Sequence, residues 1–132
     1  SPLLNESAES VDQGFAADPR IRAAVVAAPG LGFTFADGGL RSVATPVQLW
    51  TGENDRVTPD ATNGAIVRSG LRDRLEARSV PGAGHASFLA PCRLLKPPPL
   101  CEDGPGFDRA AFHRQMNADV IEFFNRTLKR PG

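Results

Sequence analysis

The sequence predicts an α/β protein built around a partial, doubly wound parallel sheet of about three strands with flanking helices. Three short strand-like runs lie at 23–28, 46–51 and 75–80, and each is followed directly by Pro or Gly. The segments between these runs are long enough to cross over a sheet, which favours parallel rather than hairpin pairing. We expect residues 1–132 to belong to one domain.

Composition excludes several classes of function. The chain has 132 residues, with 15 Lys plus Arg against 15 Asp plus Glu, so its formal net charge is zero. A neutral chain lacks the positive charge that binds a phosphate backbone, and we expect no nucleic-acid partner. No apolar run approaches the ~20 residues that span a bilayer, and we expect no membrane partner. The 13 Gly and 12 Pro indicate many loops and suggest part of a larger fold.

The N-terminal part is expected to contain one helix and one strand. Residues 7–17 favour a helix, which Asp18-Pro19 would end. The run 23–28 is apolar without alternation, which is typical of a strand covered on both faces. A Gly-rich loop at 31–41 follows it.

The middle part is expected to contain a strand at 46–51, ended by Gly52, and then a helix. Thr58 is a candidate N-cap, with Pro59 at the first helical position and Asp60 against the positive end of the helix dipole. This pattern predicts a helix to about Ser69, with Gly70 as its stop.

The C-terminal part is expected to contain a strand at 75–80, a loop excursion at about 89–106 and a helix from Asp108 to about Leu128. Five apolar residues recur every four positions along that helix and predict its buried stripe. They are Phe112, Met116, Val120, Phe124 and Leu128.

A carboxylate and a histidine follow two of the predicted strands. Asp55 lies just after the second strand and His85 just after the third. The carboxyl ends of parallel strands meet at one sheet edge, so these side chains are candidate catalytic partners. Asp55 would orient His85, and His85 would act as general base and then general acid. The alternative is an Asp that stabilises its own turn and an ordinary loop histidine.

The order of these motifs resembles the C-terminal half of an α/β-hydrolase, in the dienelactone hydrolase and platelet-activating-factor acetylhydrolase-like branch. The resemblance rests on GENDRVTP at 52–59, GAGH at 82–85, and the segment DPRIRA at 18–23 with APG at 28–30. It extends over about 18–128. It implies that residues 1–132 form the C-terminal part of one α/β-hydrolase domain, with Asp55 and His85 as the acid and base of a triad.

The family's nucleophile elbow, G-x-S-x-G, is absent from the printed sequence. None of the seven serines and neither cysteine has Gly both two residues before it and two residues after it. The resemblance implies a serine or cysteine nucleophile on a missing N-terminal segment and a small acyl substrate such as an ester or lactone. We expect the isolated chain not to hydrolyse esters efficiently. We expect no cofactor, because acyl transfer needs none, and no metal, because the chain lacks metal-ligand spacing.

A non-catalytic function is the main alternative. A short parallel sheet exposes an edge strand and an apolar face. Such a module would act by dimerising with a second copy or by docking a partner chain. A hydrolase-like protein that has lost its nucleophile is a further possibility.

Several other residues are weaker candidates. Glu53 and Arg56 are expected to be solvated loop charges, and Ser87 is placed to hydrogen bond near the site. His113 is expected to be structural or exposed. Phe33, Phe35 and Trp50 are interpreted as core residues, with the lining of an apolar substrate pocket as the alternative.

The two cysteines, Cys92 and Cys101, lie in a Pro-rich loop shortly after His85. A disulfide between them would close that loop as a lid, and it would indicate a periplasmic or secreted protein. Two free thiols in the cytosol are the alternative.

Overall fold

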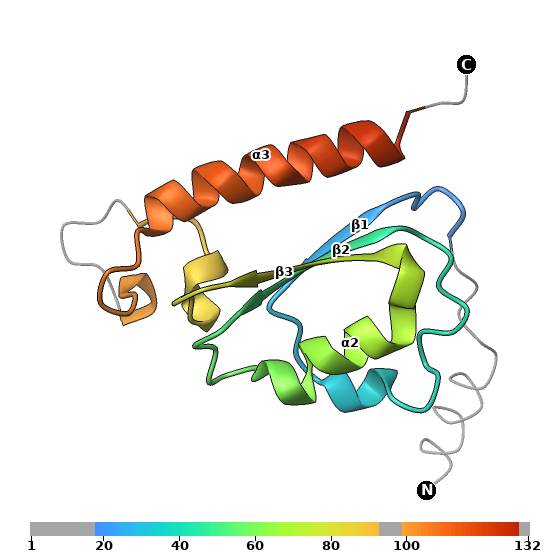
Figure 1. The fold of residues 1–132 in the computed structure, drawn as a ribbon, viewed down its shortest axis with the longest axis horizontal. Coiled ribbons are helices and arrows are strands. Elements are labelled where there is room, and N and C mark those ends of the chain that lie inside the picture. The colour runs from blue at the N-terminus through green and yellow to red at the C-terminus, as the bar shows by residue number, and fades with distance from the viewer. Residues whose placement is uncertain (1–17, 93–98, 130–132) are drawn as a thin grey trace, which may run out of the picture.

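The fold is a three-stranded parallel sheet with a helix on each face (Figure 1). The computed structural model describes residues 18–92 and 99–129. The strands are β1 (Ala24–Ala27), β2 (Val47–Gly52) and β3 (Leu75–Val80), in the order β1-β2-β3. The expected α/β class and parallel pairing are therefore confirmed, and the strands expected at 23–28, 46–51 and 75–80 are all present.

Two α-helices flank this sheet. Helix α2 (Gly64–Leu71) lies on one face and α3 (Arg109–Thr127) on the other (Figure 1). Short 3-10 turns occur between the larger elements. They are η1 (Gly32–Phe35), η2 (Asp60–Thr62), η3 (Arg72–Arg74), η4 (His85–Phe88) and η5 (Pro99–Cys101).

The central strand β2 supplies both sides of the core, because its side chains alternate between the two faces. Val47 and Leu49 pack with Val67 and Leu71 of α2. Trp50, on the opposite face, packs in a second cluster toward α3. The other members of that cluster are Val80, Ala83, Val25, Phe88, Phe107, Phe112 and Met116. Every residue of β2 is buried, whereas β1 at the sheet edge is only half-buried.

Helix α2 begins later than its capping signal predicts. Thr58 is not its N-cap, because both its backbone N–H and its hydroxyl donate to Asp55. Asp60 starts the 3-10 turn η2 and pairs with Arg68 instead. The α-helix therefore starts at Gly64, and Gly70 lies inside it rather than ending it.

The expected stripe on α3 is wrong at its C-terminal end. Leu128 is 39% exposed, whereas Phe123, which is not in the stripe, is 1% exposed. An α-helix turns about 100° per residue, so a four-residue repeat drifts by about 40° per step. From Phe112, four such steps bring Leu128 roughly 160° around the helix, while eleven residues bring Phe123 back to within about 20° of the starting face. Phe123 therefore lies on the side of Phe112.

Three points remain about the elements expected from the sequence. The helix expected at 7–17 lies outside the described residues. The loop excursion at 89–106 holds η5, and Cys92 and Cys101 form a disulfide within it. Within the described part of the chain, no helix is both long and apolar enough to cross a bilayer.

Candidate functional site

The loops that follow β2 and β3 lie against each other at the carboxyl edge of the sheet. The backbone N–H of Glu53 donates to Val80 (3.1 Å), and the N–H of Asn54 donates to Ala83 (2.9 Å). These two bonds continue the β2–β3 pairing beyond the strands. They bring the residue after Asn54 toward the turn that begins after Ala83.

Asp55 and His85 meet across these loops. Nδ1 of His85 lies 2.9 Å from Oδ2 of Asp55. The side chain of Asp55 is 2% exposed and that of His85 is 39% exposed. The structure thus places together the two residues that the sequence singles out, with the carboxylate inside and the imidazole partly open to solvent.

Asp55 also organises its own turn. Oδ1 accepts from the backbone N–H groups of Val57 (2.9 Å) and Thr58 (2.8 Å), and Oδ2 accepts from the hydroxyl of Thr58 (2.8 Å). Burial, the largest single influence, raises the pKa of Asp55, but the four hydrogen bonds from Thr58, His85 and Val57 together lower it below its ordinary value. The local, turn-stabilising interpretation of Asp55 is therefore confirmed.

This network fixes the tautomer of neutral His85. Ionised Asp55 can only accept hydrogen bonds, so the 2.9 Å contact requires a proton on Nδ1. The Thr58 hydroxyl lies 3.1 Å from the same Nδ1, but it gives its proton to Asp55 and can only accept from the ring. The lone pair of the neutral ring therefore lies on Nε2, which has no hydrogen-bond partner among the described residues.

His85 borders a small groove of about 260 Å³. Val57 and Leu100 give this groove an apolar wall, and Arg56 and Glu102 contribute charges. Both of these hydrophobic side chains are largely exposed, at 71% for Val57 and 60% for Leu100. The groove thus offers apolar surface beside His85.

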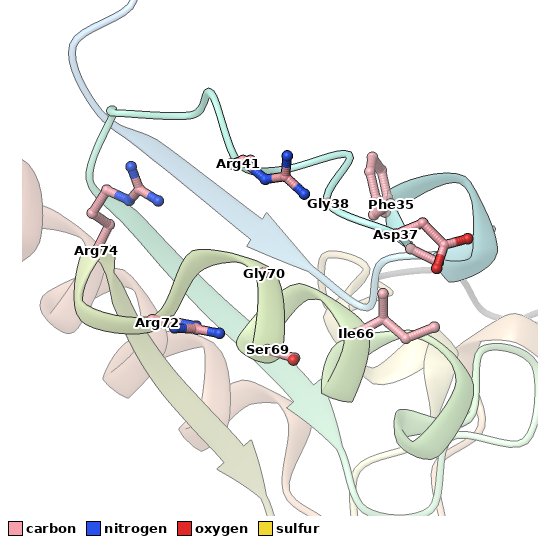
Figure 2. Close-up of a pocket in the computed structure, with 10 residues that line it drawn as sticks. Phe35, Asp37, Gly38, Arg41, Ile66, Ser69, Gly70, Arg72 and Arg74 are labelled. Atoms are coloured by element: carbon pink, nitrogen blue, oxygen red, sulfur yellow. The ribbon is translucent and has the colours of Figure 1, made fainter.

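A larger hollow lies elsewhere, on the α2 side of the sheet. It has a volume of about 620 Å³ and is lined by Phe35, Asp37, Arg41, Arg72 and Arg74, among others (Figure 2). It contains neither Asp55 nor His85. We place the candidate site at the smaller groove, because His85, the solvent-accessible member of the pair, lines it.

The weaker candidates divide between the core and the surface. Trp50 is 4% exposed and is a core residue, and Phe35 packs half-buried against the core on the α2 side, where it also lines the larger hollow. The core interpretation is wrong for Phe33, which is 72% exposed. Glu53 and Arg56 are exposed, as expected.

Ser87 and His113 are both structural. The Ser87 hydroxyl accepts from the N–H of Gly84 (3.0 Å) and donates to Asp103 (2.6 Å), so it is not free to act as a nucleophile. His113 Nε2 lies 2.9 Å from the backbone oxygen of Ser87, which agrees with the structural role expected for it.

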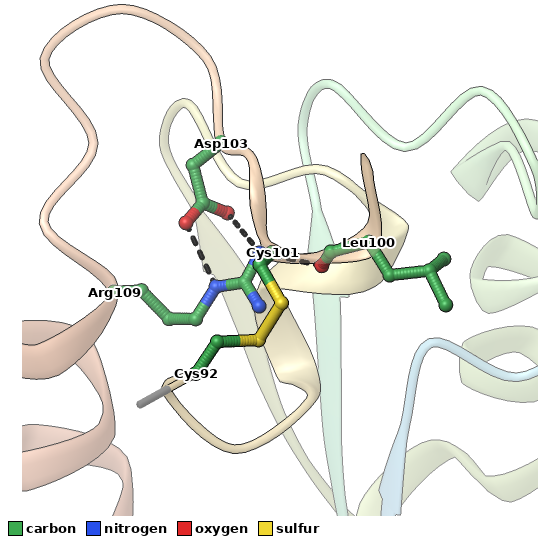
Figure 3. The surroundings of a disulfide bond; sticks show 5 residues. All are labelled: Cys92, Leu100, Cys101, Asp103 and Arg109. Carbon is green, nitrogen blue, oxygen red and sulfur yellow. Dashed lines mark hydrogen bonds and ion pairs between the residues drawn. A yellow bond between two sulfur atoms is a disulfide. The ribbon is translucent and has the colours of Figure 1, made fainter. Parts of the chain in front are cut away.

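Two residues near the site, Asp103 and Arg109, were not predicted from the sequence. They form an ion pair (2.7 Å) beside the Cys92–Cys101 disulfide, and both side chains are at most 10% exposed (Figure 3). One signal was available: Arg109 follows an N-cap directly, where the helix dipole disfavours a cation.

Within residues 18–92 and 99–129, no group of three or more His, Cys, Asp or Glu side chains comes together that could hold a metal ion. No protein family, curated protein or solved structure matches the chain.

Proposed function

We propose that this chain supplies the acid and the base of a catalytic triad, as the C-terminal portion of a serine or cysteine hydrolase of the α/β-hydrolase type. The bond cleaved is a carboxylic ester, a lactone or a similar acyl bond. The observation that carries the proposal is the 2.9 Å contact between His85 Nδ1 and a buried, ionised Asp55, which leaves Nε2 open.

The proposed mechanism uses each group in a defined role. Asp55 holds His85 in the tautomer with a proton on Nδ1 and stabilises the imidazolium that forms during proton transfer. Nε2 takes the proton of a nucleophile on another segment of polypeptide and then gives it to the leaving group. Thr58 is unsuited to be that nucleophile, because its hydroxyl lies on the Nδ1 side of the ring.

Two further features support the proposal. Asp55 and His85 follow neighbouring strands at the carboxyl edge of a parallel sheet, where doubly wound folds bind their ligands. The apolar wall formed by Val57 and Leu100 suits the hydrocarbon part of an acyl substrate. The disulfide is compatible with a periplasmic or secreted protein, and that location is part of the proposal.

The test is active-site labelling of the whole polypeptide that the gene encodes, with a fluorophosphonate and an iodoacetamide probe. We expect a single serine or cysteine, outside residues 1–132, to be labelled. The label should disappear in His85→Ala, fall strongly in Asp55→Asn, and persist in Asp37→Asn, whose carboxyl borders the distant hollow. A His85-dependent label on Ser87 would show the proposed nucleophile to be wrong. No label with either probe would reject the enzyme proposal.

The edge strand β1 favours a second candidate function, association without catalysis. Its outer edge has no strand partner among the described residues, and exposed apolar side chains flank it. Ile21 is 60% exposed, Leu31 67% and Phe33 72%. Dimerising or docking a partner chain at this edge would cover them. Sedimentation analysis distinguishes the candidates, since a stable dimer that no probe labels would favour association.

A further inference from the structure

Arg109 occupies a position that helix stability does not explain. It is the first residue of α3, where the positive end of the helix dipole disfavours a cation. Its side chain is 6% exposed, and burial of a charge is costly unless its partners compensate for it. One of its nitrogens, Nη1, has no hydrogen-bond partner among the described residues. The role of Arg109 must therefore be sought in the contacts that its side chain makes.

Those contacts converge on one carboxylate. Nε of Arg109 donates to Oδ2 of Asp103 (2.7 Å), and Nη2 donates to Oδ1 of Asp103 (3.0 Å) and to the backbone oxygen of Leu100 (3.0 Å) (Figure 3). Burial, the largest influence, raises the pKa of Asp103, but hydrogen bonds from Arg109 and Ser87 outweigh it and lower that pKa. Asp103 is therefore a fixed, ionised acceptor.

Asp103 is connected through the Ser87 hydroxyl to the turn that carries His85. Its Oδ1 accepts from the Ser87 hydroxyl (2.6 Å), and the same hydroxyl accepts from the N–H of Gly84 (3.0 Å). Gly84 directly precedes η4, and Ser87 lies within η4 two residues after His85. One buried carboxylate thus restrains the backbone on both sides of the histidine.

Helix α3 holds the same turn by two further contacts. His113 Nε2 lies 2.9 Å from the backbone oxygen of Ser87, and the ring of Phe112 packs edge-on against Phe88 with centroids 5.4 Å apart. These contacts hold the C-terminal end of the turn, at Ser87 and Phe88. Within residues 18–92 and 99–129, only the Asp103–Ser87 link reaches the backbone N–H of Gly84, directly before His85.

We infer that Asp103 and Arg109 are positioning residues for His85, which act through Ser87 to keep the histidine turn in the orientation that points Nδ1 at Asp55. The catalytic consequence rests on the proposed function. The positioning itself is a property of the folded chain and is measurable without catalysis.

The readout is the Nδ1 proton of His85, observed by NMR. A proton held between a ring nitrogen and a carboxylate resonates downfield of the backbone amides and exchanges slowly with water. The signal should be present in the unaltered chain and absent in His85→Ala, which assigns it. Its absence from the unaltered chain would contradict both this inference and the proposed function.

The main variant replaces both charged partners at once, as Asp103→Leu with Arg109→Met. Removing the pair together leaves no unpaired buried charge, so the fold should survive. We expect the Nδ1 proton to exchange about ten times faster or to vanish, the size expected when one buried hydrogen bond is lost. Ser87→Ala, which cuts the link with a single hydroxyl, should act in the same direction.

The control removes another ion pair of the same helix, as Glu76→Gln with Arg126→Met, because Arg126 of α3 pairs with Glu76 at 2.7 Å. The signal should be unchanged there. An unchanged signal in Ser87→Ala, or in a folded Asp103→Leu/Arg109→Met chain, would overturn the inference. If the variants lose the signal while the whole polypeptide takes no active-site label, the positioning stands and the hydrolase proposal fails.

Discussion

Gly52 and Ala83 come so close that a Cβ atom on Gly52 would lie 2.5 Å from the backbone oxygen of Ala83. The loop that carries Asp55 and the turn that carries His85 therefore depend on the absence of a side chain at position 52. This is a steric requirement between two backbones, and no flexible side chain can move aside to relieve it.

Gly52→Ala should therefore separate the candidate pair. Overpacking of this kind costs about 1–3 kcal/mol in the free energy of unfolding. The shift should also weaken the His85–Asp55 hydrogen bond and its Nδ1 proton signal. Urea unfolding and proton NMR would measure the two effects.

Gly84→Ala is the matched control, because a Cβ there would meet nothing closer than the Asn54 backbone oxygen at 4.0 Å. Its φ of −93° also suits any residue. An equal loss of stability in the two variants would show that the loop contact is not the cause.

Stability should fall in acid because the pKa of Asp55 is lowered in the folded chain. A depressed folded pKa contributes stability above the unfolded value, which is near 3.8 for Asp, and this stability is lost as pH falls through the folded pKa. The loss should start below about pH 5. Asp55→Asn should flatten the dependence of the unfolding free energy on pH. The slope should persist in Asp37→Asn, and an unaltered slope in Asp55→Asn would contradict the assignment.

Reduction of the Cys92–Cys101 disulfide should loosen the segment beside the candidate groove. A closed loop of this size contributes about 2–3 kcal/mol in the chain-entropy model. Reduction should lower the melting temperature and add protease cuts between the two cysteines, as limited proteolysis with mass spectrometry would show. Cys92→Ser/Cys101→Ser should behave like the reduced chain and should not respond to reductant. An identical cleavage pattern before and after reduction would count against this account.

Phe123 should contribute far more to stability than its neighbour Phe124. Phe123 is 1% exposed, and truncating a buried Phe to Ala costs about 3–5 kcal/mol. Phe124 is only half-buried, so Phe124→Ala should cost clearly less. Chemical denaturation of the two variants makes the comparison. A greater loss in Phe124→Ala would restore the four-residue stripe as the buried face of α3.

The features that could be predicted from the sequence depend on local patterns. The strand at 75–80 has those bounds in the structure, and Asp108 caps α3 by accepting from the N–H of Ala111 (2.9 Å). The Asp55–His85 contact could also be predicted, because each residue follows a predicted strand and parallel strands bring the residues that follow them to one edge of the sheet. This rule of sheet topology predicts the contact without any knowledge of side-chain positions.

Two of the features that were missed depend on side-chain contacts that leave no periodic signal in the sequence. Thr58 has the composition of an N-cap, but Asp55 engages it and α2 starts later. Asp103 and Arg109 meet through a loop with no regular pattern, so no periodicity could identify them. Phe123 was missed for a different reason, because a strict four-residue repeat does not follow the 3.6-residue helical turn.

The alternation along β2 also determines where the chain can change length. Val47 and Leu49 pack in the core toward α2, and Trp50 packs in the core toward α3. A single inserted or deleted residue within β2 would exchange the two sets of side chains and spoil both cores together. We therefore expect this fold to tolerate changes of length in its connecting loops and not in β2, so that loops at the carboxyl edge can be remodelled for a new ligand while the strands remain unaltered.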